Sequence, residues 1–270
     1  MAGPLLAKLI RPVSPHRLGH PSRLCLLTGL LLLSGCSVAL LVPTDEILRN
    51  VRLRGPETSP VVALTFDDGP NGRCTEATLD ALAAVGAPAT FFVLGCNVTT
   101  TAHDELLARM LRDGHRIGLH GWGHGLRQCT QQYAAADLAR GALAIRTSLS
   151  RSGIAAEQNG KLLFRPPFGV VTNELARAAR EGGYPIVLWS ISVGDWRSDV
   201  SPETITARIL ETVGAGDVIV LHDGATERQR SAKACVDRAN AAAVVRLLVP
   251  ALRAKGLQPA PLSVVLGLTE

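Results

Sequence analysis

The sequence of 270 residues is poor in aromatic side chains, which make up 4% of it. With so few aromatic rings, a folded core must be built mainly from Leu, Val, Ile and Ala. The apolar run from Leu24 to Leu33 is too short to span a bilayer comfortably. No basic patch with interleaved aromatic residues is present, so nothing in the sequence argues for nucleic-acid binding.

The chain has little excess charge once its N-terminal segment is set aside. It holds 28 Lys and Arg against 23 Asp and Glu, a formal net charge of +5. Four of the basic residues and none of the acidic ones lie in residues 1–36, so the remainder carries 24 basic against 23 acidic side chains. The high isoelectric point therefore results mostly from the basic residues of the N-terminal segment.

The N-terminus has the features of an export signal. Four basic residues precede the run 24–33, and the run ends in Leu33-Ser34-Gly35-Cys36-Ser37, which resembles a bacterial lipoprotein cleavage box. We expect residues 1–36 to be a signal peptide, Cys36 to carry the lipid, and residues 37–59 to form a tether. An ordinary signal peptide or an uncleaved anchor are the alternatives. We expect the protein to be exported to the cell envelope. It would be anchored to the membrane only through the lipid on Cys36, or else secreted.

The chain lacks any Cys-x-x-Cys spacing, which argues against a cysteine-based metal site. Beyond Cys25 in the signal and Cys36, an even number of cysteines remains. In an exported domain this suggests two disulfides, with three possible pairings. A cysteine nucleophile is a weak alternative in an oxidising compartment. The cysteines in question are Cys74, Cys96, Cys129 and Cys235.

After residue 60, runs typical of strands alternate with runs typical of helices, which predicts one α/β domain with parallel strands. The expected strands are 61–66, 90–94, 116–119, 162–165, 186–190, 218–221 and 262–266. The expected helices are 75–85, 102–112, 133–150, 173–181, 202–211 and 239–255, the last with a break at Pro250.

Asp67 and Asp68 end the apolar run 61–66 and lead directly into Gly69-Pro70, a sequence typical of an abrupt turn. Two carboxylates at the end of a buried strand suggest a metal site together with its base. The alternative is a pair of solvated turn residues.

Two histidines four residues apart, His120 and His124, follow another short apolar stretch. Two imidazoles and one carboxylate can bind zinc or a similar ion and leave positions open for water and substrate. The glycines around them favour a tight loop. Two ordinary polar loop histidines are the alternative.

Arg165 is followed by two prolines, which stiffen the chain and fix the approach of the side chain. A guanidinium at the edge of a core needs a carboxylate partner. The alternative is an arginine on a solvated loop. Further on, Asp195 precedes Trp196, and His222 stands where the run 218–221 stops.

Taken in order, these segments resemble the five motifs of the polysaccharide deacetylases that share the NodB homology domain, also called carbohydrate esterase family 4. The resemblance covers about residues 60–265. The matching segments are Thr65 to Pro70, His120 to His124, Arg165 to Gly169, Asp195-Trp196 and Val220 to Asp223. The resemblance implies a distorted (β/α) barrel of about seven parallel strands in residues 60–270, with the motifs at the carboxyl ends of the strands.

The resemblance also implies roles for individual residues. Asp68, His120 and His124 would bind a divalent metal, Zn²⁺ first, with Co²⁺, Ni²⁺ or Fe²⁺ able to substitute. Asp67 would be the general base that takes a proton from the attacking water, and Arg165 would keep it ionised and aimed. His222 would be the general acid, with its ring oriented by Asp195. The remaining implied residues bind substrate: a main-chain N–H near Phe168 would stabilise the oxyanion, and Trp196 and Val220 would line the acetyl pocket.

The sequence departs from the family pattern at four positions. Gly121 replaces the usual Ser or Thr, which predicts a lost hydrogen bond and weaker metal binding. Ser192 replaces an aspartate. Phe168 stands for Tyr, and Val220 for Leu, which would alter the fit of the substrate.

The resemblance implies no role for His103, His115 or Trp122. We expect His103 and His115 to be surface or helix-end residues, and Trp122 to pack the histidine loop in preference to stacking on a sugar.

The expected function is metal-dependent removal of N-acetyl groups from N-acetylglucosamine units of an envelope or extracellular polysaccharide: peptidoglycan, chitin-type oligomers or poly-N-acetylglucosamine. An O-acetyl esterase acting on xylan is one alternative, and a surface-tethered carbohydrate-binding protein without turnover is another. The expected partner is the acetylated polysaccharide, and the expected state is a monomer.

Overall fold

The structure, a computed structural model, describes residues 51–125, 131–155, 159–197, 199–224 and 240–268. The expected signal peptide and lipoprotein box, most of the tether, Cys129, Cys235 and the first residue of the helix expected at 239–255 lie outside the described residues.

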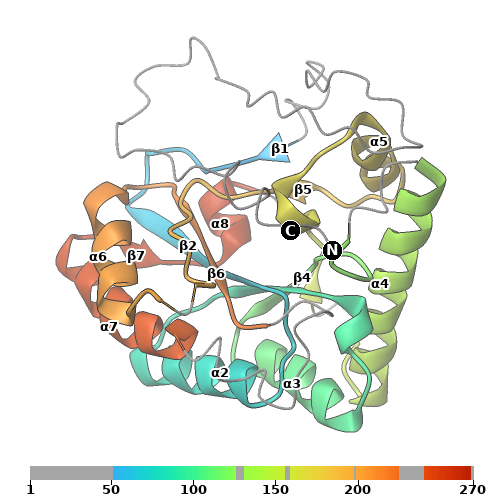
Figure 1. The fold of residues 1–270 in the computed structure, drawn as a ribbon, viewed down its shortest axis with the longest axis horizontal. Coiled ribbons are helices and arrows are strands. Elements are labelled where there is room, and N and C mark those ends of the chain that lie inside the picture. Colours follow the sequence, from blue (N-terminus) through green and yellow to red (C-terminus); the bar gives the residue numbers. More distant parts are fainter. Residues whose placement is uncertain (1–50, 126–130, 156–158, 198, 225–239, 269–270) are drawn as a thin grey trace.

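Parallel strands form the centre of the fold, as the alternation of the sequence predicts (Figure 1). The strands β4, β3, β2 and β6 lie side by side in that order, β7 pairs with the start of β2, and β1 pairs with β5. Isolated bridges join Leu119 to Phe164, Phe164 to Ile186 and Ile191 to Ile219, and so carry the strands round from β4 to β5 and back to β6. The strands therefore form a distorted barrel, in which single bridges replace continuous strand pairing between β4 and β5 and between β5 and β6. The strand bounds are β1 (Val51–Arg52), β2 (Val61–Asp67), β3 (Thr90–Val93), β4 (Arg116–Leu119), β5 (Ile186–Val187), β6 (Val218–His222) and β7 (Gln258–Pro259).

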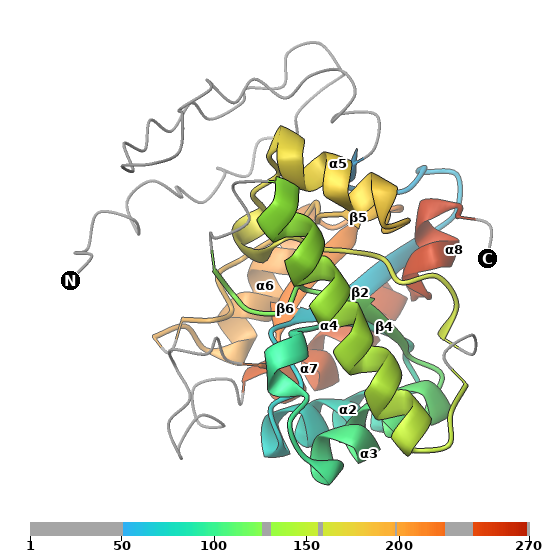
Figure 2. The same ribbon diagram turned by 90° about the vertical axis from the view of Figure 1, so that its right-hand side faces the viewer.

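Helices surround these strands, and the long α4 crosses one side of the barrel (Figures 1 and 2). Several begin at a hydroxyl side chain that accepts a main-chain N–H of the first turn: Thr100 for α3, Thr172 for α5 and Ser201 for α6. The helix bounds are α2 (Arg73–Val85), α3 (Thr101–Arg112), α4 (Gln131–Arg151), α5 (Asn173–Glu181), α6 (Pro202–Thr212), α7 (Asn240–Ala254) and α8 (Leu262–Leu266), with two 3-10 turns, η2 (Gly95–Asn97) and η5 (Pro167–Gly169). Among the described residues, none of the helices combines the length and apolar character that a membrane crossing needs.

Alternate residues of β2 belong to two different apolar clusters, because successive side chains of a strand point to opposite faces. Leu64 and Phe66 belong to the larger cluster, which the surrounding helices complete. Ala63 belongs to a smaller cluster with Phe92 and Val187, which also includes residues of α8. The main core is aliphatic, as the low aromatic content predicts.

The prediction of a strand at 262–266 is wrong, because this segment forms the helix α8. Leu262, Val265 and Leu266 are its buried residues, a spacing of three and four that suits a helix and not an alternating strand. The last strand is instead the short β7. Short apolar runs are ambiguous between the two states, which explains the error.

Other differences concern element ends. The helix α7 continues through Pro250, which lies on the exposed face of the helix. Proline has no N–H for the main-chain carbonyl four residues earlier, but on this face that carbonyl can bond to water instead. The strand expected at 162–165 is reduced to a bridge at Phe164, and that at 186–190 to two residues. The strand β1 lies within the stretch expected to be a tether.

Of the two expectations for His115, a surface or a helix-end residue, the first is wrong, since His115 is only 3% exposed. It follows the C-terminal end of α3, and its Nδ1 accepts the main-chain N–H of Ala89. Its ring also meets the edge of Phe91. His103 lies in the first turn of α3, as expected.

Candidate active site

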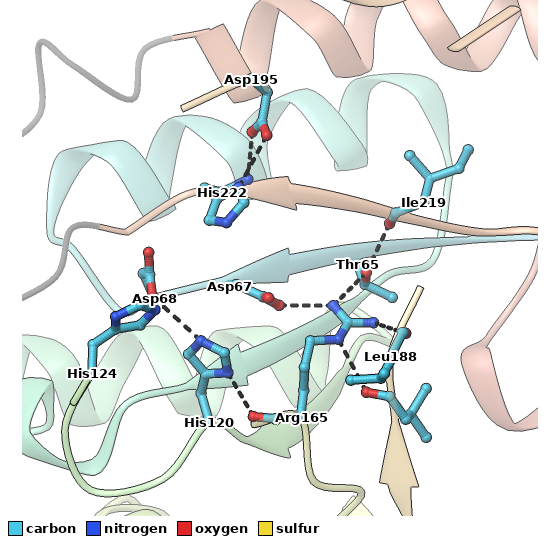
Figure 3. Close-up of polar contacts among 11 residues, drawn as sticks. Thr65, Asp67, Asp68, His120, His124, Arg165, Leu188, Asp195, Ile219 and His222 are labelled. Carbon is cyan, nitrogen blue, oxygen red and sulfur yellow. Dashed lines mark hydrogen bonds and ion pairs between the residues drawn. The ribbon is translucent and has the colours of Figure 1, made fainter. Parts of the chain in front are cut away.

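Four of the expected site residues stand where neighbouring parallel strands end. Asp67 is the last residue of β2, and His222 is the last residue of β6 and pairs with it in register. His120 directly follows β4, and Arg165 directly follows the bridge at Phe164. Because the carboxyl ends of parallel strands meet at one edge, these side chains converge there (Figure 3).

Asp68, His120 and His124 form a group whose ligand atoms all lie within 4.8 Å of one another. The Nε2 atoms of both histidines lie 3.5 Å from Asp68 Oδ1. Bonds of 2.0–2.1 Å in a tetrahedral zinc site place two ligand atoms about 3.3 Å apart, so the observed spacing is close to that of ligands around one ion.

The electrostatics of this group also suit a metal ion. Asp68 Oδ1 is buried and has no hydrogen-bond partner among the described residues. Burial favours the neutral acid, yet the contact with His120 and the charges of His222 and the other histidines hold the pKa of Asp68 below its usual range. Burial lowers the pKa of His124 to about 4, against the opposing effect of Asp68. The carboxylate is therefore ionised and this imidazole neutral, which are the forms that bind a metal.

The other ring nitrogen of His120, Nδ1, lies 2.7 Å from the main-chain oxygen of Arg165. Because a carbonyl can only accept, Nδ1 carries the proton and Nε2 presents its lone pair toward Asp68. The ring of His124 instead packs edge-on against Phe168, with the centroids 4.2 Å apart. One ligand is thus oriented by a hydrogen bond and the other by an aromatic contact.

Arg165 is fully buried and points into the barrel toward Asp67 (Figure 3). Its Nη1 lies 2.8 Å from Asp67 Oδ1 and 2.8 Å from Thr65 Oγ1, and Nη2 donates to the Leu188 carbonyl at 2.8 Å. The guanidinium also lies over the ring of Phe92, 4.0 Å from its centroid. Burial lowers the pKa of Arg165 and the charge of Asp67 opposes this effect. These contacts leave Asp67 one permitted orientation.

His222 and Asp195 form the second pair of the site. Asp195 Oδ1 lies 3.0 Å from His222 Nδ1, and Oδ2 accepts the main-chain N–H of His222 at 2.7 Å. Burial disfavours the charged imidazole, but the charge and hydrogen bond of Asp195 outweigh it and raise the pKa of His222 to about 9. The imidazole is therefore protonated at neutral pH and can donate a proton.

The expected substrate-binding residues lie around this edge. Phe168 is 46% exposed beside His124, and Trp196 is 42% exposed and meets the ring of His222 edge-on at 5.2 Å. Val220 is buried, two residues before His222 on the same face of β6. Phe168 has φ of 61°, a left-handed conformation that is costly for a bulky residue and is characteristic of functional sites. Ser192 is exposed, whereas Asp195 is buried.

Sequence reasoning missed several residues that hold the site. Thr65 receives an Arg165 hydrogen bond and donates one to the Ile219 carbonyl at 2.7 Å. Asn97 donates to the main-chain oxygen of Asp68 at 2.7 Å, which holds that residue at its positive φ of 74°. The only sequence signal was a polar residue inside or next to an apolar run.

Asp223 is the last residue of the fifth motif segment, and the family resemblance implies no role for it. It is fully buried, and its Oδ2 accepts a hydrogen bond from Thr75. Burial raises its pKa to about 7, against the effect of that hydrogen bond. Its carboxylate also lies against Gly69, where a side-chain carbon would come within 2.8 Å of it.

Comparison with known proteins finds relatives over most of the described residues. Residues 54–187 match the polysaccharide deacetylase family. The chain is 32% identical over 203 residues to a chitooligosaccharide deacetylase of Bradyrhizobium sp. (strain ANU 289), a match covering 74% of this chain and 88% of that protein. It is 30% identical over 197 residues to a peptidoglycan-N-acetylglucosamine deacetylase of Bacillus cereus, covering 72% and 85%.

Solved structures agree with the fold. A peptidoglycan N-acetylglucosamine deacetylase in complex with 4-naphthalen-1-yl-N-oxidanyl-benzamide superposes with a TM-score of 0.68 at 25% identity, covering 82% of this chain and 94% of that one. A family 4 carbohydrate esterase from Streptomyces lividans in complex with acetate superposes with a TM-score of 0.60 at 27% identity, covering 74% and 91%.

Proposed function

This chain belongs to the polysaccharide deacetylase family, and we propose that it removes N-acetyl groups from N-acetylglucosamine residues of an envelope or extracellular polysaccharide. Peptidoglycan, chitin-type oligomers and poly-N-acetylglucosamine are the candidate polymers. The observation that carries the proposal is the position of Asp67 and His222 beside the group Asp68, His120 and His124: a carboxylate held by Arg165 and a protonated imidazole lie next to one possible metal site.

The residues Asp68, His120 and His124 would hold a divalent ion, and we propose Zn²⁺, with Co²⁺, Ni²⁺ or Fe²⁺ able to substitute. The orphaned Asp68 oxygen and the 3.5 Å spacings support this assignment. When bound, the ion would polarise the amide carbonyl and lower the pKa of water.

Asp67 would accept the proton of the attacking water. The carboxylate is 2% exposed and bonded on one oxygen by Arg165, so its other oxygen is the one available to a reacting molecule. The Arg165 hydrogen bond orients the carboxylate, which a general base requires.

His222 would donate the proton that the departing amine needs. Asp195 holds Nδ1, so Nε2 faces the site with its proton. The bond between the carbonyl carbon and nitrogen breaks as the nitrogen takes this proton, giving acetate and a free amino group on the sugar.

The turn at Phe168 would supply a main-chain N–H to the oxyanion, and Trp196 and Val220 would line the pocket for the acetyl methyl group. The left-handed φ of Phe168 supports this role, because it turns the peptide sharply just beyond the two prolines. The exposed rings of Phe168 and Trp196 would meet the sugar.

The alternatives make different demands on the site. An O-acetyl esterase would use the same residues on an ester, whose alkoxide leaving group needs less assistance from an acid. A binder without turnover has no use for a protonated His222 held by Asp195 or for a fully buried Arg165 at Asp67. The complete set of acid, base and ligands therefore supports an enzyme.

We also propose the following organisation outside the site: residues 1–36 as a signal peptide with a lipidated Cys36, residues 37–59 as a tether whose last part packs on the barrel through β1, residues 60–270 as the deacetylase domain, and a monomer in the envelope. Two disulfides among Cys74, Cys96, Cys129 and Cys235 belong to the same proposal. The disulfide-bonded state of Cys74 supports one of them, whereas the Cys96 thiol, which donates to Asn97 Oδ1 at 3.6 Å, does not support the other.

The test is a substrate panel scored by acetate release from the purified protein. Release from N-acetylated chito-oligomers or peptidoglycan with added Zn²⁺, and its loss with a chelator, is the expected outcome. Release from acetylated xylan alone would favour the esterase. Affinity for the polymer without acetate release under any metal would favour the binder.

A further inference from the structure

The loop that carries both metal-binding histidines, residues 120–124, makes its main contacts with two elements outside the site, η2 and α4. Its main chain is bonded to η2 at two points: Gly95 N–H donates to the Gly121 carbonyl at 2.9 Å, and Cys96 N–H donates to the Trp122 carbonyl at 2.7 Å. In the middle of the loop, Trp122 N–H donates to Asp137 Oδ2 on α4 at 2.9 Å. Asp137 therefore supplies the side-chain hydrogen bond that fixes the centre of this loop.

The Trp122 side chain is held by the same helix. The guanidinium of Arg140 lies over its ring, 3.6 Å from the centroid, a distance typical of a cation–π contact. On Gly95, an added side-chain carbon would lie 3.0 Å from the indole, so η2 also packs against Trp122. The indole therefore packs the loop, as the sequence analysis expected, and the face under Arg140 is not available to a sugar.

Glycines let the loop, η2 and α4 approach closely. A side-chain carbon on Gly141 would come within 2.8 Å of the Gly121 carbonyl, and one on Gly95 within 2.7 Å of the Gly141 main chain. Gly121 has φ of 89°, which favours glycine. The loop path therefore requires glycine at position 121, and Ser or Thr there would be strained.

Asp137, Arg140 and Gly141 are spaced three and four residues apart, so they share one face of α4. This face contacts Trp122 and Gly121, the two residues that follow His120 directly. Among the described residues, the two imidazole rings contact residues from other elements: Nδ1 of His120 is held by Arg165, and His124 packs on Phe168.

We propose that Asp137 and Arg140 are positioning residues for the metal site, which set the distance between His120 and His124 by fixing the main chain at Trp122. The inference rests on the proposed metal-dependent function and deepens it. Outer partners that orient metal ligands typically contribute 10- to 100-fold to metal affinity. Asp137 acts through its hydrogen bond, so an acceptor of the same shape preserves the effect.

The experiment measures Zn²⁺ affinity of the full-length protein by competition with a chromogenic chelator, together with the melting temperature of the metal-free protein. Asp137→Ala is expected to weaken Zn²⁺ binding about tenfold. Asp137→Asn keeps an acceptor oxygen and is expected to bind within about twofold of the unaltered protein. Arg140→Ala is expected to weaken binding severalfold, whereas Arg146→Ala, an exposed arginine on the same helix, serves as the control and is expected to change nothing.

Unchanged Zn²⁺ affinity in Asp137→Ala would overturn the proposal, even if the metal-free variant melts at a lower temperature, since that would be a purely structural role. An equal loss in Asp137→Asn and Asp137→Ala would also overturn it, because the hydrogen bond would not be the cause. If the unaltered protein bound no divalent ion, the proposed function itself would fail and this inference with it, and that result is seen before any variant is compared.

Discussion

The Arg165 guanidinium and the Asp67 carboxylate form an ion pair of 2.8 Å, with Arg165 fully buried and Asp67 only 2% exposed. A buried pair of this kind adds little to stability on balance, because both charges lose their hydration. Its position at the end of β2, next to the proposed metal-binding residues, supports a role for the pair in orienting the proposed base.

Arg165→Lys is therefore expected to reduce kcat/KM for deacetylation by about 100-fold or more. The lysine keeps the charge but cannot reach Asp67, Thr65 and the Leu188 carbonyl together, because it lacks the planar fork. Steady-state kinetics checks this, with Zn²⁺ affinity expected to stay the same. Arg109→Lys, at a surface ion pair with Asp80, is the matched control. Activity as high as that of the control variant would show that the fork does not matter.

Asp67 and His124 are expected to separate turnover from metal binding. Asp67→Asn removes the proton acceptor while leaving the three ligands in place, so turnover should be abolished and Zn²⁺ retained. His124→Ala removes a ligand, so the metal itself should be lost. Zinc content after gel filtration, measured by atomic emission, distinguishes the two. Equal metal loss in both variants would contradict this separation of roles.

Asp195→Asn is expected to change the pH profile of kcat/KM. Asp195 raises the pKa of His222 to about 9 against the effect of burial, and the acid form is active below that pKa. Removing the charge lowers the pKa of His222, so the alkaline limb of the profile should move to lower pH by about one unit. An alkaline limb that stays in place would mean that His222 is not the acid that the profile reports.

His115 is expected to make the fold sensitive to acid. Burial lowers its pKa to about 4 from the ordinary value of 6.5, so between these values the unfolded chain binds the proton and the folded protein does not. The stabilising effect is complete above pH 6.5 and is lost as the pH falls toward 4, by about 1–3 kcal/mol.

Replacement of His115 by Gln removes this titration, so the metal-free variant should lose less stability between pH 7.5 and 4.5 than the unaltered protein does. Thermal unfolding at both pH values measures the difference. The same loss of melting temperature in both proteins would show that His115 does not contribute to the pH dependence.

The metal-binding group could be predicted from sequence because its members stand next to apolar runs that become parallel strands. His120 and His124 each come to 3.5 Å from Asp68 mainly because β2 and β4 end at the same edge of the barrel. The partnership of Arg165 with a carboxylate followed from the cost of burying an unpaired guanidinium.

Other features depend on three-dimensional contacts that no local pattern reveals. Asn97 reaches the main chain of Asp68 from a separate turn, and Asp137 reaches Trp122 from a helix 15 residues away. The stretch 262–266 resembles a strand because its four apolar residues and one serine carry no clear periodicity, and packing against the start of β2 makes it a helix.

The central claim is that one divalent ion, held by Asp68, His120 and His124, is required for removal of acetyl groups. The most direct measurement is acetate release from an N-acetylated chito-oligomer by metal-free protein titrated with Zn²⁺. We expect no release without metal, a rise that saturates at one equivalent of Zn²⁺, and no rise for His124→Ala at that concentration. Undiminished release from protein shown to be free of metal would contradict the claim.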